Sequence, residues 1–171
     1  MKATFCRVST PGQIEKVVQL AEVIWNEHYS AIIGSEQVKY MLNNFHSPSA
    51  ISSEVGDENT HYYLIFCGED AVGYIAVKVE EQSLFLSKFY ILSRERGNGI
   101  GSQSIKFIRE FAKSNQLEKI TLTINKENTR SIAVYKKIGF KITGEICADI
   151  GGGYVMDDYQ MELGVQLNEN A

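Results

Sequence analysis

The sequence contains little proline, cysteine or histidine. Its 171 residues include 2 prolines, 3 cysteines and 3 histidines. Scarce proline, together with the lack of any tract of biased composition, argues against a long linker or tail. Hydrophobic residues make up 44% and charged residues 22% of the chain, which is typical of a globular protein and not of a disordered one. We therefore expect one domain that spans residues 1–171.

The cysteines and histidines form no pattern that indicates a disulfide framework or a metal site. The cysteines are odd in number and far apart: Cys6, Cys67 and Cys147. The histidines show no metal-ligand spacing with one another or with a cysteine. Because all three cysteines lie in apolar runs that are typical of strands, we expect small buried thiols, no metal and a reducing, cytoplasmic location.

The chain also lacks long apolar runs and an excess of basic residues. No run approaches the roughly 20 apolar residues that span a bilayer, and the segment Met1–Arg7 lacks the apolar core of a signal peptide. The 17 basic and 21 acidic side chains give a net charge of −4. This balance argues against a general nucleic-acid binder, which is normally basic. It is compatible with a cationic substrate, and we expect neither a nucleic-acid nor a membrane partner.

The N-terminal half predicts helices followed by an antiparallel meander. Thr10, Pro11 and Gln13 combine an N-cap, a proline at the first helical position and a capping-box glutamine. Apolar residues at helical spacing follow as far as Trp25, and a second helix is expected after Ser35. The polar stretch 51–60 favours neither helix nor strand. The runs expected to form strands, separated by short polar turns, are 4–8, 62–67, 72–79 and 84–92.

The C-terminal half alternates between helical and strand patterns. Apolar spacing predicts helices around 105–112 and 128–138, the second of them capped by Asn128 and ended by Gly139. Strands are expected at 120–124, 140–150 and 154–163, and a glycine turn lies between the last two. The whole pattern predicts an α/β (mixed α+β) fold with one mixed sheet of about six to seven strands and helices on both faces.

A glycine-rich segment lies between an expected strand and an expected helix: Arg94-Glu95-Arg96-Gly97-Asn98-Gly99-Ile100-Gly101-Ser102. Glycine permits unusual backbone dihedrals and close approach of a ligand. A helix N-terminus offers amide donors and a positive dipole end, which together suit a pyrophosphate. An ordinary strand-to-helix turn would show the same glycines. The segment matches neither a P-loop, which requires a Lys before Ser or Thr, nor the dinucleotide fingerprint G-x-G-x-x-G.

Two separate motifs resemble the GCN5-related N-acetyltransferase (GNAT) superfamily. The family's acetyl-CoA motif, [QR]-x-x-G-x-[GA], fits in two registers, Arg94-x-x-Gly97-x-Gly99 and Arg96-x-x-Gly99-x-Gly101. The segment from Asn128 to Phe140 is similar to the family's N-x-x-[SA]-x-x-x-Y-x-K-x-G-F signature. Order and spacing agree with the family over nearly the whole chain. Among its members, the layout is most like bacterial single-domain proteins, including spermine/spermidine-type acetyltransferases.

The resemblance implies a cofactor-binding role for a defined set of residues. The end of the strand before the loop would hold the pantetheine arm through its backbone, the loop amides would hold the pyrophosphate, and Asn128 would contact the cofactor. Tyr135 would protonate the departing thiolate, and a backbone N–H near Ile91 could stabilise the oxyanion. The implied residues are Phe89, Tyr90, Ile91, Arg94, Arg96, Gly97, Asn98, Gly99, Ile100, Gly101, Ser102, Asn128 and Tyr135.

The acceptor side is less defined by the sequence. An alkyl amine with a pKa of about 10.4 is mostly protonated at pH 7, so a base or a site that lowers its pKa is needed. Spacing does not choose among the candidate carboxylates Glu27, Glu80, Glu81, Glu95, Asp149, Asp157 and Asp158. Trp25, His28 and Tyr29 end the first expected helix. In the family the first helices form the acceptor wall, so His28 and Tyr29 could meet substrate, although a surface or packing role explains them better.

The resulting functional expectation is acetyl-CoA-dependent transfer of an acetyl group to a primary amine of a small molecule, such as a polyamine, an amino acid or an amino sugar. Acetylation of a protein N-terminus or of a lysine is one alternative. A CoA-binding sensor without turnover is another. Many members of the family are dimers, so a homodimer is compatible with the resemblance.

Overall fold

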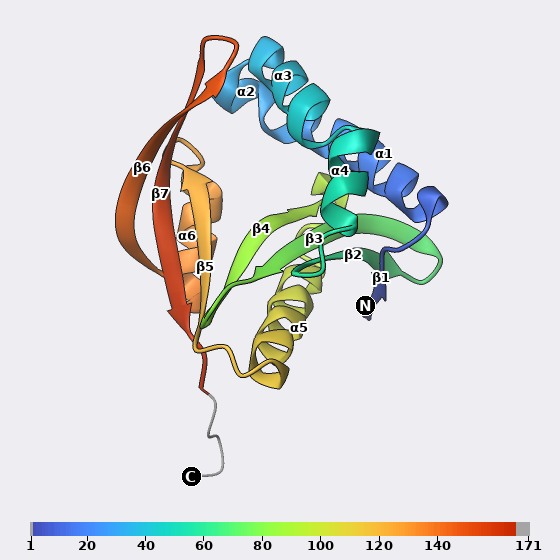
Figure 1. Ribbon diagram of the computed structural model, residues 1–171, viewed down its shortest axis with the longest axis vertical. Helices are drawn as coiled ribbons and strands as arrows, with labels where there is room; N and C mark the ends of the chain where they lie inside the picture. The colour runs from blue at the N-terminus through green and yellow to red at the C-terminus, as the bar shows by residue number, and fades with distance from the viewer. Residues whose placement is uncertain (1, 167–171) are drawn as a thin grey trace. The chain divides into compact units, whose positions relative to one another are not determined.

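The computed structural model describes residues 2–166 (Figure 1). The chain divides into two compact units. Unit 1 comprises the residues up to Lys78 together with Lys88–Ile108. Unit 2 comprises Val79–Ser87 together with the residues from Arg109 onward. Each unit is therefore built from two separate stretches of the chain.

Unit 1 contains the N-terminal helices and an antiparallel group of strands. Its elements are β1 (Ala3–Arg7), α1 (Pro11–His28), α2 (Ser30–Ile33), α3 (Ser35–Phe45), α4 (Pro48–Val55), β2 (Thr60–Cys67), nearly all of β3 (Asp70–Val79), the end of β4 (Ser83–Ile91), the 3-10 turn η1 (Ser93–Glu95) and the start of α5 (Ile100–Ser114). β2 pairs antiparallel with both β1 and β3. The predicted capping box is present, because Gln13 N–H donates to Thr10 Oγ1 and the Gln13 side chain accepts from Thr10 N–H.

Two short helices in unit 1 went unpredicted. α2 has only four residues, too few to show a helical period. α4 begins with Ser47 as N-cap and Pro48 at its first position, and it ends near Gly56. From the sequence alone, Ser47-Pro48 indicates only an interruption of the preceding helix. That pair also begins the next helix, which occupies part of the stretch left unassigned.

Helices cover both faces of the unit 1 strands. Tyr62 and Tyr63 are neighbours in β2, so their side chains point to opposite faces. The Tyr62 hydroxyl donates to Glu54 on α4 at 2.9 Å. The Tyr63 ring packs edge-on against Phe107 of α5, with centroids 4.9 Å apart. α4 and α5 therefore lie on opposite sides of β2.

Unit 2 contains β5 (Lys119–Asn125), α6 (Thr129–Ile138), β6 (Lys141–Gly151) and β7 (Tyr154–Gly164), together with the start of β4. β5 runs parallel to β4 and antiparallel to β7, which pairs with β6 on its other side. The seven strands of the described residues follow the order β1-β2-β3-β4-β5-β7-β6. The predicted mixed sheet is confirmed, as is the hairpin turn between the last two strands.

The expected burial of the cysteines is wrong. All three lie in strands, as predicted, but Cys6 and Cys147 are exposed and Cys67 is half-buried. β1 and β6 are the terminal strands of the sheet, where apolar composition does not guarantee cover on both faces. Among residues 2–166, no group of His, Cys, Asp and Glu is placed to hold a metal ion. None of the described helices is long and apolar enough to cross a bilayer.

Candidate active site

The glycine-rich loop of unit 1 turns sharply from β4 into α5. η1 follows the end of β4, and Gly97 and Gly99 have φ angles of 82° and 79°, in the left-handed region where a side chain is strained. α5 begins directly afterwards at Ile100. The expectation of unusual dihedrals holds for Gly97 and Gly99. It is wrong for Gly101, which lies in the first turn of α5 together with Ser102.

The space above the loop glycines is open. A Cβ atom added at Gly97 or Gly101 would meet no atom within 4 Å, and one added at Gly99 would meet only the Gln103 amide nitrogen at 4.0 Å. Packing within the protein therefore does not explain glycine at position 101. The first amides of a helix have no acceptor inside the helix, so this backbone can approach and donate to an anionic group.

The side chains of the loop are tied to the loop itself and to α1. Arg94 Nε lies 3.5 Å from Glu95 Oε1, and Asn98 donates to Glu95 Oε2 at 3.3 Å. Glu27, near the end of α1, accepts a hydrogen bond from Ser93 N–H at 2.9 Å. His28 Nδ1 lies 3.3 Å from an Arg96 guanidinium nitrogen. The C-terminal end of α1 thus braces the loop, which sequence spacing could not reveal.

The end of β4 lies directly against β3. Leu92 N–H donates to Val72 O at 2.8 Å, and a Cβ atom at Gly73 would clash with the Tyr90 carbonyl oxygen. The Tyr90 side chain joins an aromatic cluster in unit 1. Its ring centroid lies 5.5 Å from Trp25 and 5.4 Å from Tyr74. The cluster consists of Trp25, Tyr29, His46, Tyr74 and Tyr90.

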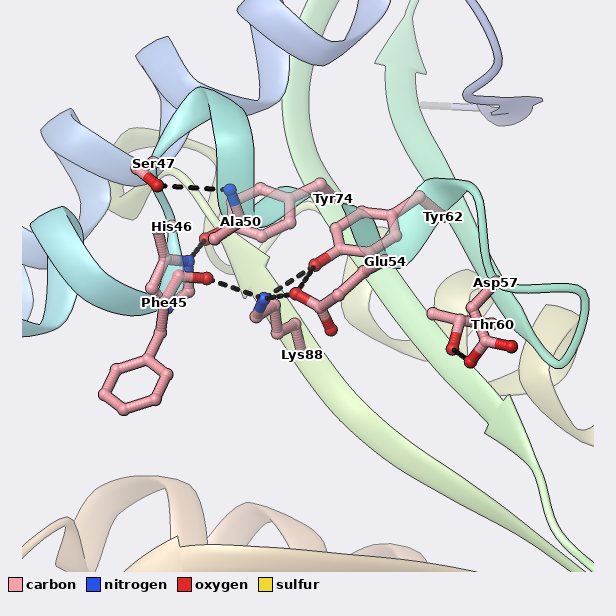
Figure 2. A network of polar contacts seen from close by, with 10 residues as sticks. All are labelled: Phe45, His46, Ser47, Ala50, Glu54, Asp57, Thr60, Tyr62, Tyr74 and Lys88. Atoms are coloured by element: carbon pink, nitrogen blue, oxygen red, sulfur yellow. Dashed lines mark hydrogen bonds and ion pairs between the residues drawn. The ribbon is translucent and has the colours of Figure 1, made fainter. Parts of the chain in front are cut away.

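A buried polar network adjoins this cluster (Figure 2). Lys88 Nζ donates to Tyr62 Oη at 2.6 Å, to Glu54 Oε1 at 2.8 Å and to Phe45 O at 3.0 Å. Burial lowers the pKa of Lys88, and the hydrogen bond and charge of Glu54 oppose that shift.

His46 follows Phe45, whose carbonyl oxygen accepts from Lys88. The Tyr74 hydroxyl lies 3.2 Å from His46 Nδ1. Burial holds the pKa of His46 well below its usual value, and the Lys88 charge adds to this effect, so the ring is neutral at pH 7. Sequence reasoning missed this network. A lysine inside the apolar run 84–92 was the available signal.

Unit 2 holds the second motif. Asn128 is buried and occupies the N-cap of α6, but its side chain makes no capping hydrogen bond, contrary to expectation. Its backbone N–H donates to Asn125 O at 3.0 Å and its carbonyl accepts from Ile132 N–H at 3.1 Å. Tyr135 is half-buried on α6, with its ring centroid 5.2 Å from that of Phe140. Gly139 ends the helix at φ 124°, as predicted.

The seven candidate carboxylates differ sharply in their surroundings. Glu27, Glu80, Glu81, Asp149 and Asp157 are exposed, and Glu95 is half-buried in its contacts with Arg94 and Asn98. Asp158 alone of the seven is buried, with 4% of its surface exposed. Its Oδ1 has no hydrogen-bond partner among the described residues. Burial and the neighbouring Asp157 charge raise the pKa of Asp158 to about 6, while Lys126 opposes the shift.

Several known proteins are similar to this chain in sequence. A spermine/spermidine N(1)-acetyltransferase of Bacillus subtilis is 32% identical over 74 residues, which cover 43% of this chain and 47% of that protein. A spermidine N(1)-acetyltransferase of Thermoplasma acidophilum is 20% identical over 133 residues, covering 75% of this chain and 83% of the relative. The uncharacterized N-acetyltransferase YobR of B. subtilis is 38% identical over 60 residues, which cover 35% of this chain. This chain spans less than half of both B. subtilis relatives, 24% of YobR and 47% of the other.

Solved structures agree on the fold. The PaiA N-acetyltransferase of T. acidophilum, crystallised with coenzyme A, superposes with a TM-score of 0.81 at 18% identity and covers 96% of this chain and 99% of its own. The ribosomal-protein-S18-alanine N-acetyltransferase of Escherichia coli gives 0.73 at 13% identity, with 99% of each chain covered. The model of the acetyltransferase (GNAT) family matches residues 18–140, a span that includes both motifs. This chain therefore belongs to the acetyltransferase (GNAT) family.

Proposed function

We propose that the chain is an acetyl-CoA-dependent N-acetyltransferase that acts on a primary amine of a small molecule. The observation that carries the proposal is the loop from Gly97 to Ser102, where two left-handed glycines precede a helix start with open space above its backbone. This loop coincides with the family's acetyl-CoA motif. The CoA complex of the T. acidophilum PaiA protein is consistent with the same donor here.

The proposal assigns the donor side to residues of both motifs. The amides of Arg96–Ser102 hold the pyrophosphate, and Arg94 and Arg96 contribute positive charge. The backbone of Phe89, Tyr90 and Ile91 binds the pantetheine arm. Asn128 contacts the cofactor, and the Tyr135 hydroxyl protonates the leaving thiolate. Direct attack by the amine requires no covalent enzyme intermediate, so no serine or cysteine nucleophile is assigned.

A polyamine is the acceptor we test first. Three polyamine acetyltransferases are among the relatives, two at 31–32% identity over 74 residues and one at 20% over 133. The net charge of −4 also suits a polycation. Amino acids and amino sugars are the other small amines in the proposal. A homodimer and a cytoplasmic location stay predictions from the sequence.

Thiol release from acetyl-CoA is the measurement that tests the function. The panel contains polyamines, amino acids, amino sugars, aminoglycosides and short peptides, and we expect turnover with one class of small amines. Turnover confined to peptides would replace the small-molecule acceptor by a protein N-terminus or a lysine. If acetyl-CoA binds but no amine is acetylated, the chain is a CoA-binding sensor and the proposal fails.

Two variants separate binding from chemistry. Gly99→Asp introduces bulk, negative charge and backbone strain at a φ of 79°, and we expect acetyl-CoA affinity to fall at least about 100-fold. Tyr135→Phe keeps the ring that packs on Phe140, so we expect unchanged affinity and a fall in kcat of about 100-fold. Undiminished affinity in the first variant contradicts the placement of the phosphate loop. Undiminished kcat in the second removes Tyr135 from the acid role.

A further inference from the structure

Acetyl transfer to an amine needs a group that takes a proton from the acceptor, and the carboxylates of this chain are unequal candidates. Five of the seven are exposed, where a carboxylate is ordinarily solvated and a weak base. Several also have partners: Glu27 accepts from Ser93 N–H, Asp149 accepts from Gly151 N–H, and Asp157 pairs with Lys126. Asp158 differs from all of them.

Asp158 is a buried carboxylate whose Oδ1 has no partner among the described residues. Burying an ionised carboxylate without hydrogen bonds is costly, so buried charges in proteins are nearly always paired. Exceptions concentrate at sites that bind or transform a ligand. A suitable donor is close by, because the Lys126 ammonium lies 2.9 Å from the carboxylate of Asp157, which precedes Asp158 in β7. That ammonium pairs with Asp157 and Glu145 and not with Asp158.

The position of Asp158 links it to the second motif. In the sheet of unit 2, Asp158 pairs with Asn125 at the end of β5 and with Ile146 of β6. Lys126 N–H donates to Asp157 O at 3.2 Å, and Asn128 N–H donates to Asn125 O at 3.0 Å. Asp158 therefore adjoins the turn that begins α6, the helix of Tyr135. Strand alternation places its side chain on the face of the sheet opposite Leu163. Leu163 packs against Gly139, so Asp158 faces away from the C-terminal end of α6 and is close only to the turn at its start.

We infer that the Asp158 carboxylate binds the ammonium group of the acceptor and accepts its proton before acetyl transfer. This inference rests on the proposed N-acetyltransferase function and names the group that works on the acceptor. An ammonium group supplies the partner that Asp158 Oδ1 lacks among residues 2–166.

The proton and electron balance is complete. The ammonium gives one proton to an Asp158 oxygen, and the freed lone pair forms the N–C bond to the acetyl carbonyl carbon. The C–S bond breaks with its electron pair moving to sulfur, and the thiolate takes a proton from the Tyr135 hydroxyl. The nitrogen gives its second proton to the Tyr135 oxygen, and Asp158 releases its proton to solvent. The products are the amide, the thiol and one proton.

The electrostatics of unit 2 support this role. A pKa of about 6 makes Asp158 roughly a hundredfold stronger base than an aspartate near the ordinary value of 3.8. The charged groups around it within unit 2 are Asp157 on β7, Lys126 after β5 and Glu145 on β6, which pairs with Lys126. At pH 7 to 8 the carboxylate is mostly ionised, so it can attract a cation and then take up its proton.

The test compares Asp158→Asn with Asp157→Asn. Both remove one negative charge from neighbouring positions of β7, but Asp157 is exposed. With the amine that wild type acetylates, we expect kcat/KM to fall at least about 100-fold in Asp158→Asn and less than about threefold in Asp157→Asn. The acetyl-CoA Kd should change less than about twofold in both. The Tm of Asp158→Asn should equal or exceed that of wild type, because an unpaired buried charge is removed.

Three results overturn the inference: more than a third of wild-type kcat/KM in Asp158→Asn, an equal loss in the two variants, or a loss of acetyl-CoA binding with a lowered Tm. If wild type acetylates no amine, the proposed function fails, and spermidine binding to the CoA-saturated protein tests Asp158 alone. Binding to wild type that weakens at least tenfold in Asp158→Asn supports the ammonium site. Equal binding to both proteins, or no binding to either, overturns it.

Discussion

Two buried charged groups, Lys88 in unit 1 and Asp158 in unit 2, differ in their partners. Lys88 has 8% of its surface exposed and donates to three oxygens within 3.0 Å (Figure 2). Asp158 has 4% exposed, and its Oδ1 accepts no hydrogen bond from the described residues. The first arrangement satisfies a buried charge completely, as structural sites do. The second leaves one oxygen of a buried carboxylate without a partner among these residues, and on this observation we assign Asp158 to the acceptor.

The pKa shifts of Lys88 and Asp158 also differ in what their neighbours do. Burial lowers the pKa of Lys88, but Glu54 offsets part of the effect by its hydrogen bond and charge. Burial raises the pKa of Asp158, and Asp157 raises it further. Glu54 therefore opposes the loss of the Lys88 proton, whereas both burial and Asp157 favour proton uptake by Asp158. Both groups are buried, so the difference between them lies in their hydrogen-bond and ion-pair partners.

Removing a partner of Lys88 should give the largest change in the free energy of unfolding. In Glu54→Ala, Lys88 stays buried with only Tyr62 and Phe45 O as partners. We expect a loss of about 2 kcal/mol in the free energy of unfolding, below the usual range for buried pairs because the Glu54 side chain is 36% exposed. Lys88→Met removes the charge itself and should cost only about 1 kcal/mol. Urea denaturation measures both, and a larger loss in Lys88→Met would contradict the structural role assigned to Glu54.

The raised pKa of Asp158 should make the free energy of unfolding depend on pH. Its folded pKa of about 6 lies above the ordinary value of 3.8, so the folded state binds the proton more tightly. The stabilisation by protonation is fully present below pH 3.8 and is lost as the pH rises through 6. Allowing for solvent screening, wild type should lose about 2 kcal/mol relative to Asp158→Asn between pH 3.5 and pH 7.5. A constant difference between the two proteins across this range would show that Asp158 has an ordinary pKa.

The network also predicts a smaller effect at Tyr62. Its hydroxyl donates to Glu54 and accepts from Lys88, so Tyr62→Phe removes two hydrogen bonds but leaves the Lys88–Glu54 pair. We expect a loss of about 1.5 kcal/mol in the free energy of unfolding, with acetyl-CoA affinity unchanged. Tyr63→Phe is the matched control, because Tyr63 follows in the same strand and its ring packs on Phe107 of α5. An equal loss in the two variants would mean that the Tyr62 hydroxyl is not part of the network's stability.

Sequence analysis predicted the strands and the longer helices because their signals are local. The capping box at Thr10, the meander and Gly139 at the end of α6 each depend on a few neighbouring residues. The glycine-rich loop between β4 and α5 was also predicted from the sequence, although Gly101 proved helical. Short helices such as α2 have too few residues to show the apolar spacing by which a helix is recognised in a sequence.

The partners of buried charges could not be predicted in this way. Lys88 contacts Phe45, Glu54 and Tyr62, all at least 26 positions away in the sequence. Asp158 and Asp157 are adjacent acidic residues with identical local signals, yet one is buried and the other exposed. In the paired strands their difference comes from opposite faces of β7. The sequence therefore offers seven candidate carboxylates among which spacing does not choose, and only the packing separates them.

The last test changes the pKa of Asp158 by substituting its charged neighbours, while Asp158 itself stays in place. Asp157 raises the pKa of Asp158 and Lys126 lowers it, so neutralising each neighbour should move the acidic limb of the kcat/KM profile in opposite directions. Asp157→Asn should shift that limb to lower pH and Lys126→Met to higher pH, each by a few tenths of a pH unit, because both neighbours are partly screened by solvent. Lys126→Met also releases Glu145 and Asp157 from their ion pairs, which adds to the upward shift. A pH titration of acetyl transfer in all three proteins measures this. Shifts of the same sign would assign the limb to a group other than Asp158, because loss of an acidic and of a basic neighbour moves the pKa of that carboxylate in opposite directions.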